Sequence, residues 1–281
     1  GRNGVHTDSI SRISYLFAQY YQRPVSRLIK TMSENIIFEK RNNIGIITLN
    51  RENVLNAWNK DMRFKICNIF NKIKTKKDIK AVVITGSGKK AFCAGQDLNE
   101  LKNFNEKKID SWIDEFEKVY TSIRSAEIPI IGAINGIAAG SGFQLALLTD
   151  IRVSHKKAKF GQVEINSGVV SIIGPWIMRE VLGLSKTIEL CLTGRLVMGD
   201  EALKIGIIHH ITKSNKVMSL SLKIAKELSN KPNKAMRLTK QRIWEVFKDG
   251  MIEVFKKAKQ YHRKSFSSGE PQKTTKKFLN K

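Results

Sequence analysis

The chain has 281 residues, and its 50 Lys and Arg residues against 25 Asp and Glu residues give a formal net charge of +25. Hydrophobic residues make up 41% of it, which is enough to bury one large core or two modest ones and excludes a wholly disordered chain. The cysteines are far apart in sequence, which argues against a disulfide framework or a zinc site and fits a reducing compartment; they are Cys67, Cys93 and Cys191.

The first 31 residues are rich in Arg and Ser and contain a single acidic residue, Asp8. This composition resembles an organelle transit peptide. We therefore expect residues 1–31 to be an N-terminal extension, either a transit peptide or a tail, before a domain that begins near Met32. The protein is expected in the cytoplasm, or in the mitochondrial matrix if the extension is a transit peptide.

Strands and helices alternate in the prediction for residues 36–124. The hydrophobic pattern predicts strands at 36–40, 44–49 and 81–85 and amphipathic helices at 61–74 and 109–124. Asp97 and Glu100 have the spacing of a capping box, which predicts that a helix begins there.

No charged residue occurs from Ile128 to Thr149, a length that would be sufficient to cross a membrane. However, the segment contains Pro129, Gln144 and four glycines. A buried strand, a glycine-rich turn and a buried helix at 142–148 fit this pattern better, so we predict no membrane span.

The rest of the chain is predicted to be mainly helical. After a strand at 151–154, helices are expected at 174–182, 185–192, 200–205, 216–229, 233–247 and 251–266, followed by a Lys-rich tail. Residues 213–281 contain 19 basic and 5 acidic residues, a net charge of +14. Such a charge fits a polyanionic partner such as nucleic acid, but a residue bias that charges the solvated surface is the preferred interpretation.

The order of elements predicts an α/β layered core in residues 32–212 and a helical unit in residues 213–281.

Two glycine-bearing turns in this core each join a buried strand to a helix, at 91–97 (AFCAGQD) and 135–144 (NGIAAGSGFQ). Small residues at such turns leave backbone N–H groups unpaired and admit a ligand closely. Two N–H groups from different turns can form an oxyanion hole. Neither turn has a dinucleotide, phosphate-loop or nucleophile-elbow spacing, and the histidines have no metal-binding spacing.

Five ordered segments between about residues 36 and 212 together resemble the enoyl-CoA hydratase/isomerase, or crotonase, superfamily. They are RENVLNAW, VVITGSGKKAFCAGQDL, NGIAAGSGFQLALLTD, AKFGQVEINSGVVSIIG and LTGRLVMGDEALKIGIIHHI. The sequence departs from the family pattern at three positions: Glu52 replaces a proline, Ser141 stands where glycine is frequent, and Gln144 replaces a glutamate.

The resemblance implies a crotonase-like spiral of ββα units with a helical C-terminal trimerisation region, and a homotrimer or a dimer of trimers. It implies an acyl-CoA thioester as the ligand, with coenzyme A as part of the substrate and neither a separate cofactor nor a metal. The backbone N–H groups of Ala94 and Ser141 would hold the thioester oxygen as it becomes an enolate. The CoA path would be lined by Ala57, Ala91, Ala94, Gln96, Asp97 and Leu98. The helix cap is the preferred role for Asp97.

The acid and base positions decide the reaction. Family hydratases use two glutamates, whose positions are Gln144 and Glu164 here, and an amide cannot act as a general base near neutral pH. A single carboxylate suits Δ3 to Δ2 enoyl-CoA isomerisation, in which Glu164 removes the α-proton and returns it at the γ-carbon. The alternative is an enoyl-CoA hydratase in which Gln144 orients water and Glu164 alone transfers protons. A minor alternative is an RNA-binding protein on a crotonase scaffold.

Overall fold

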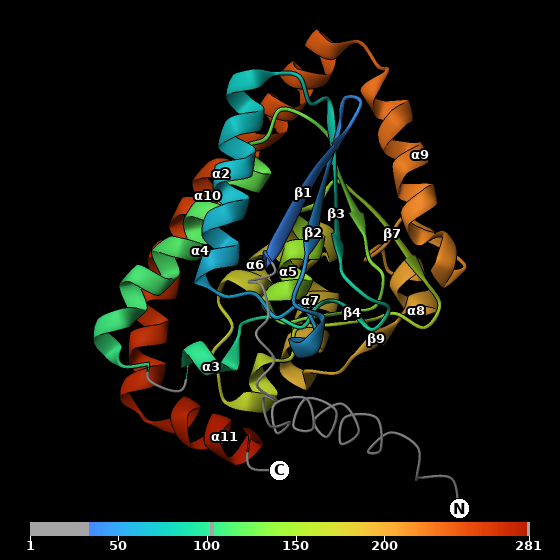
Figure 1. Ribbon diagram of the computed structural model, residues 1–281. Helices are drawn as coiled ribbons and strands as arrows, with labels where there is room; N and C mark the ends of the chain where they lie inside the picture. The colour runs from blue at the N-terminus through green and yellow to red at the C-terminus, as the bar shows by residue number, and fades with distance from the viewer. Residues whose placement is uncertain (1–33, 102–103, 280–281) are drawn as a thin grey trace, which may run out of the picture.

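The computed structural model describes residues 34–101 and 104–279, and the predicted extension at 1–31 lies outside them (Figure 1). The β1–β2 hairpin is antiparallel, and every further pairing in its sheet is parallel. Asn42, in its turn, has a φ of 56°, a left-handed conformation that asparagine tolerates. Within the described residues this sheet has six strands, in spatial order β1 (Ile36–Arg41), β2 (Ile44–Leu49), β3 (Ala81–Gly86), β5 (Ile130–Ala133), β7 (Ile151–His155) and β10 (His210–Thr212).

Helices cover both faces of this sheet, which is why the parallel strands β3 and β5 are continuously apolar and buried (Figure 1). On one face, α9 (Val217–Ser229) packs against β3, β5 and β7. On the other face, α2 (Lys60–Lys76) and α4 (Ile109–Arg124) enclose the main hydrophobic core, and α10 (Asn233–Ser267) packs against α4.

A second, smaller sheet lies at the ends of these strands and consists of β4 (Ala91–Cys93), β6 (Ile137–Ala139), β8 (Lys159–Gly161) and β9 (Val197–Met198). Units such as β5, β6 and the helix α5 (Ser141–Leu148) contribute one strand to each sheet before their helix, so the predicted series of ββα units is confirmed. The sequence did not predict this small sheet, because its strands are only two or three residues long and overlap the glycine-bearing turns.

The C-terminal helices differ from the prediction in two ways. The helices expected at 233–247 and 251–266 form one helix, α10 (Asn233–Ser267). A Cβ atom on Gly250 would lie 2.9 Å from the Trp176 ring, so this glycine permits close packing instead of ending the helix. The expected tail also contains a helix, α11 (Glu270–Leu279).

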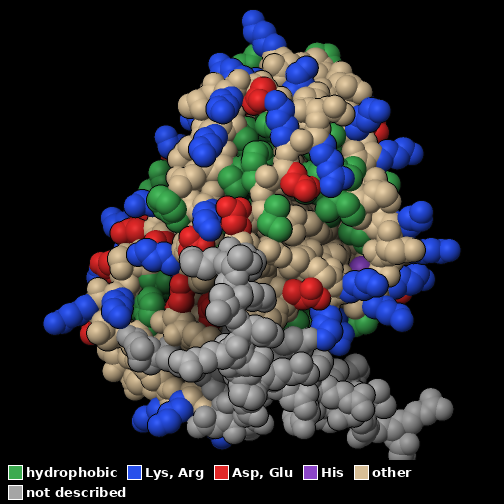
Figure 2. All heavy atoms as spheres, viewed as in Figure 1, with side chains coloured by type: hydrophobic (Ala, Val, Ile, Leu, Met, Phe, Trp, Pro, Cys, Tyr) green, Lys and Arg blue, Asp and Glu red, His purple; other side chains and the backbone are tan. Residues whose placement is uncertain are grey.

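The remaining helical elements are shorter. They are α3 (Leu98–Leu101), α5 (Ser141–Leu148), α6 (Ile173–Leu182), α7 (Leu184–Thr193), α8 (Gly199–Lys204) and the 3-10 turns η1 (Glu52–Val54), η2 (Glu106–Lys108), η3 (Glu164–Ser167) and η4 (Ser214–Lys216). The uncharged segment 128–149 forms β5, β6 and α5, and none of the described helices has the length and apolarity needed to cross a membrane. Figure 2 shows Lys and Arg side chains scattered over the visible face and along its edges without gathering into one patch.

Candidate active site

A cavity of about 180 Å³ brings the two predicted turns together, between the small sheet and helices α4 and α10. Its walls are mainly apolar, and the C-terminal helices contribute His262 and Thr275 to them. Seven of the residues selected from the sequence line this cavity: Ala57, Ala94, Gln96, Leu98, Ser141, Gln144 and Glu164.

Two residues predicted for the CoA path do not line the cavity. Ala91 is buried in β4, where its carbonyl accepts hydrogen bonds from the Nδ2 groups of Asn56 and Asn135 at 2.9 and 3.2 Å. The Asp97 carboxylate accepts from Nη1 of Arg51 at 2.7 Å and from the backbone N–H of Asn99 at 2.9 Å. Neither residue lines this cavity, and Asp97 is the helix cap at the start of α3. Their place on the CoA path stays a prediction.

The structure contradicts the first predicted oxyanion donor, the backbone N–H of Ala94. The Ala94 N–H donates to the Leu55 carbonyl at 3.0 Å and is therefore not free. Gln96, two residues after Ala94, forms a parallel β-bridge with Trp58. The hydrogen bonds of this bridge join Trp58 to Gly95 and Asp97, the residues on either side of Gln96. The Gln96 N–H thus lies on the other edge of this segment, and it has no acceptor among the described residues. Gln96, not Ala94, supplies the free donor of the first turn.

The second predicted donor, the Ser141 N–H, is at the first position of α5, where a helix has no internal acceptor for it. The two turns approach each other closely at Gly95, whose φ is 105°. A Cβ atom on Gly95 would lie 2.8 Å from the Ala139 carbonyl oxygen and 3.5 Å from the Ser141 nitrogen. Only glycine fits this contact, and it places the Gln96 and Ser141 peptides side by side.

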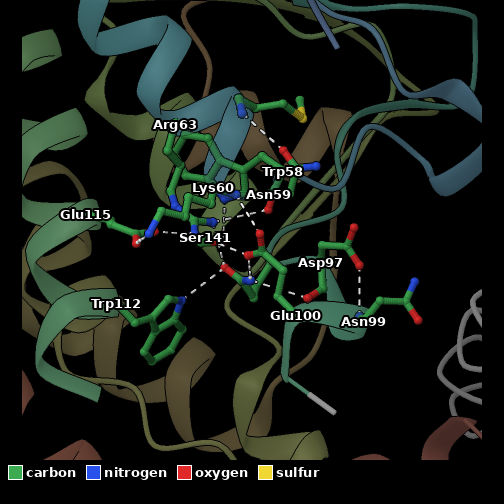
Figure 3. A network of polar contacts seen from close by, with 12 residues as sticks. Trp58, Asn59, Lys60, Arg63, Asp97, Asn99, Glu100, Trp112, Glu115 and Ser141 are labelled. Carbon is green, nitrogen blue, oxygen red and sulfur yellow. Dashed lines mark hydrogen bonds and ion pairs between the residues drawn. The ribbon is translucent and has the colours of Figure 1, made fainter. Parts of the chain in front are cut away.

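Trp58 holds both turns. Its backbone pairs with the first turn, through the bonds from Trp58 N–H to Gly95 and from Asp97 N–H to Trp58. Its indole Nε1 donates to the Ser141 hydroxyl of the second turn at 2.9 Å (Figure 3). The serine that replaces the frequent glycine therefore provides a side-chain acceptor, a role that the sequence alone did not indicate.

The Gln96 side chain is fixed by a partly buried polar network. Its Oε1 accepts from Nη1 of Arg63 at 3.1 Å and from Nε1 of Trp112 at 3.3 Å, and its Nε2 donates to Glu100 at 2.7 Å. Arg63 is only 2% exposed and also pairs with Glu115 at 2.8 Å, and Figure 3 shows these side chains converging from α2, α3 and α4. The first turn is therefore held in place by bonds on its side chain as well as on its backbone.

Glu164, at the start of η3, lies against the second turn. A Cβ atom on Gly140 would lie 3.1 Å from its Oε1, and Gly140 has a φ of 55°. The Oε2 atom is enclosed and has no hydrogen-bond partner among the described residues. Burial raises the pKa of Glu164 to about 7, against smaller lowering effects of backbone hydrogen bonds and of Gln162. This carboxyl is therefore divided between its two protonation states near neutral pH, as suits a group that both accepts and donates protons.

Gln144 lies between Glu164 and a buried tyrosine. Its Oε1 accepts from the Tyr120 hydroxyl at 2.7 Å, and its Nε2 lies 3.4 Å from oxygens of both Gln162 and Glu164. Burial raises the pKa of Tyr120 well above its ordinary value, so its hydroxyl remains a proton donor to Gln144. Among the described residues that line the cavity, Glu164 is the only carboxylate.

The described residues include no group of three or more His, Cys, Asp or Glu side chains that would hold a metal ion. Cys67, Cys93 and Cys191 are all free thiols. The N–H groups of Gln96 and Ser141, beside the Glu164 carboxyl, can stabilise a developing oxyanion next to one acid or base.

Comparison with known proteins agrees with this geometry. The family model for Enoyl-CoA hydratase/isomerase matches residues 39–281. The chain is 31% identical over 210 residues to the short-chain-enoyl-CoA hydratase of Clostridium acetobutylicum, covering 74% of this chain and 80% of that one. It is also 31% identical to the crotonyl-CoA hydratase of Syntrophomonas wolfei over 208 residues, again 74% and 80% of the two chains. In fold, it matches an enoyl-CoA hydratase/isomerase from Mycobacterium paratuberculosis with a TM-score of 0.81 at 24% identity, over 88% of this chain and all of the other. The chain belongs to the enoyl-CoA hydratase/isomerase, or crotonase, family.

Proposed function

We propose that this enzyme binds the thioester oxygen of an enoyl-CoA through the N–H groups of Gln96 and Ser141, with Glu164 as its acid and base. The observation that carries the proposal is the position of the Glu164 carboxyl against Gly140, beside two adjacent N–H groups that have no acceptor among the described residues. Charge that develops on the thioester oxygen would meet these donors, and one such donor is typically worth about 3–4 kcal/mol in the transition state.

Hydration of a 2-enoyl-CoA is the candidate that the two relatives described above favour, because both are named hydratases. In this reaction, the Glu164 carboxylate takes a proton from water as the water oxygen bonds to the β-carbon and electrons move onto the thioester oxygen. The enolate then re-forms the carbonyl as Glu164 returns that proton to the α-carbon. Gln144 would orient the water through its amide, which Tyr120 holds in place.

Isomerisation of a 3-enoyl-CoA to the 2-enoyl-CoA is the second candidate, and Gln144 is the observation that favours it. With one carboxylate in the cavity, a single group both removes and returns the proton. Glu164 would take the α-proton to leave the enolate and would return the proton at the γ-carbon as the double bond moves. No water enters this reaction, so no second base is needed.

The test is to incubate the protein with crotonyl-CoA and, separately, with 3-hexenoyl-CoA, and to identify products by mass spectrometry and chromatography. Hydration adds 18 mass units, whereas isomerisation moves the double bond at constant mass. The variant Gln144→Glu separates the candidates. A natural hydratase changes little on this substitution, whereas a large gain of hydration would show that the natural protein is built for isomerisation. Absence of turnover with both thioesters would overturn the proposal.

We also propose that the protein assembles as a trimer or a dimer of trimers, as its family membership implies. Apolar side chains on α7 support an interface between copies, since Leu184, Ile188 and Leu192 are 60%, 49% and 72% exposed and follow each other at four-residue intervals. Sedimentation velocity of the protein and of Leu192→Asp measures this assembly, and a monomeric natural protein would contradict it.

A further inference from the structure

The cavity has a second end, under the C-terminal helices, whose residues the proposed chemistry does not use. Apolar side chains form most of its wall here, including Leu101, Ile113 and Phe116. Two polar residues stand among them: His262 of α10, which is 5% exposed, and Thr275 of α11, which is 7% exposed.

His262 is enclosed by aromatic rings. Its ring lies edge to face with Trp112, 5.2 Å between centroids, and 6.4 Å from the ring of Phe266. Its Nδ1 atom is buried without a hydrogen-bond partner, and neither its Nε2 nor the Thr275 hydroxyl has a partner among the described residues. A phenylalanine would provide the same ring contacts, so the imidazole adds hydrogen-bonding capacity that the described chain leaves unused.

The electrostatics of this end limit what it would bind. Burial lowers the pKa of His262 to about 4, so the imidazole is neutral near pH 7 and carries one N–H donor and one acceptor nitrogen. No Lys or Arg is found among the described residues that line the cavity, so a carboxylate on the ligand would have no cationic partner. A hydroxyl group, which is uncharged and both donates and accepts, matches His262 and Thr275.

We propose that His262 and Thr275 form a polar subsite that recognises a hydroxyl group on the acyl chain of the thioester substrate. The inference rests on the proposed function, because the subsite shares its cavity with Gln96, Ser141 and Glu164. Trp112 connects the two ends, since its indole N–H bonds to the Gln96 side chain while its ring contacts His262. The apolar wall around the subsite suits an acyl chain better than the polar amides of the pantetheine arm.

The experiment compares enoyl-CoA thioesters of equal length with and without a hydroxyl at successive carbons from C5 to C8. We expect the natural protein to prefer one hydroxylated position, with kcat/KM at least about tenfold above that of the plain chain, because a site built to hydrogen-bond a hydroxyl rejects the analogue that lacks it. In His262→Phe, which keeps the ring contacts, and in Thr275→Val, the ratio of kcat/KM for the hydroxylated chain to that for the plain chain falls toward one. The variant His262→Gln, which retains a donor and an acceptor, keeps part of the preference.

Three results would overturn the subsite: no preference at any position, preference for a carboxylate at the same carbons, or an equal loss on plain and hydroxylated chains in both variants. The last result would place the two residues on the CoA portion. Calorimetric binding of saturated acyl-CoA thioesters with and without the hydroxyl tests the subsite independently of turnover. Turnover without preference therefore contradicts this inference alone, whereas preferential binding without turnover of any thioester contradicts only the proposed reaction.

Discussion

The two ends of the cavity differ in whether their polar side chains are hydrogen-bonded within the protein. At the end formed by the turns, Gln96, Gln144 and Ser141 each have a hydrogen-bond partner in another element. At the end formed by the C-terminal helices, His262 and Thr275 have none among the described residues. Leaving a buried polar group unpaired costs about 1–3 kcal/mol of stability. A ligand that hydrogen-bonds to such a group would explain why the protein keeps it. Paired groups hold the site in place, and unpaired groups show where atoms of the ligand belong.

The largest expected effect is at Glu164. It is the exception at the first end, since its Oε2 has no hydrogen-bond partner among the described residues. Glu164→Gln should lower kcat by roughly 10²–10⁴-fold, the usual contribution of general acid–base catalysis. For the natural protein, kcat/KM should rise with pH through about 7, the pKa of Glu164, because the ionised form is the base. Steady-state rates from pH 5 to pH 9 measure both effects, and a variant with undiminished kcat would remove Glu164 from the mechanism.

The same substitution should increase stability in alkaline solution. The pKa of Glu164 is raised from 4.5 to about 7 in the folded protein, so the unfolded chain releases its proton first and stability is lost as pH rises through this interval. At about 1.4 kcal/mol per pH unit, this loss reaches up to about 3 kcal/mol above pH 7. Urea unfolding should therefore show a larger gain for Glu164→Gln at pH 8 than at pH 5. An equal effect at the two pH values would contradict the raised pKa.

A smaller effect on the free energy of unfolding compares the two ends directly, by placing a phenylalanine at each of them. Tyr120→Phe removes a hydroxyl that donates to Gln144 at 2.7 Å, and it should lower the free energy of unfolding by about 1–2 kcal/mol. His262→Phe removes an imidazole whose Nδ1 has no partner in the described part of the chain, and it should raise that free energy by about 1 kcal/mol. Urea unfolding of both variants at pH 7 measures the difference. Destabilisation by both substitutions would mean that the His262 side chain is hydrogen-bonded as the Tyr120 hydroxyl is, which would contradict the difference between the two ends.

Sequence patterns predicted the parts of this molecule that depend on local periodicity. The hairpin, β3 and the helices α2 and α4 lie where the pattern of apolar residues placed them, within two residues. The small sheet was missed because its strands are too short to show a period. The single helix α10 was missed because Gly250, a helix breaker by propensity, is required by its contact with Trp176.

The candidate site was predictable only in part for a similar reason. Ser141, Gln144 and Glu164 were selected from motifs, and all three line one cavity. Ala94 was the wrong donor because its N–H bonds to Leu55, a long-range pairing that no local pattern encodes. His262 and Thr275 also depend on tertiary structure, since only the packing of α10 and α11 brings them to a cavity whose other lining residues lie between Ala57 and Leu196.

The smallest expected effect tests whether paired groups at the first end do hold the site in place. Trp58→Phe keeps a ring against Tyr120 but removes the indole N–H that binds the Ser141 hydroxyl at 2.9 Å, and Ser141→Ala removes the acceptor. Each should lower kcat about fivefold with little change in KM, because a displaced N–H weakens the transition state more than the ground state. The double variant should be no slower than either single variant, which corresponds to a coupling free energy of about 1 kcal/mol. Trp176→Phe, outside the cavity, is the matched control. Fully additive losses would show that Trp58 acts through packing alone, and the pairing at this end would then be incidental to catalysis.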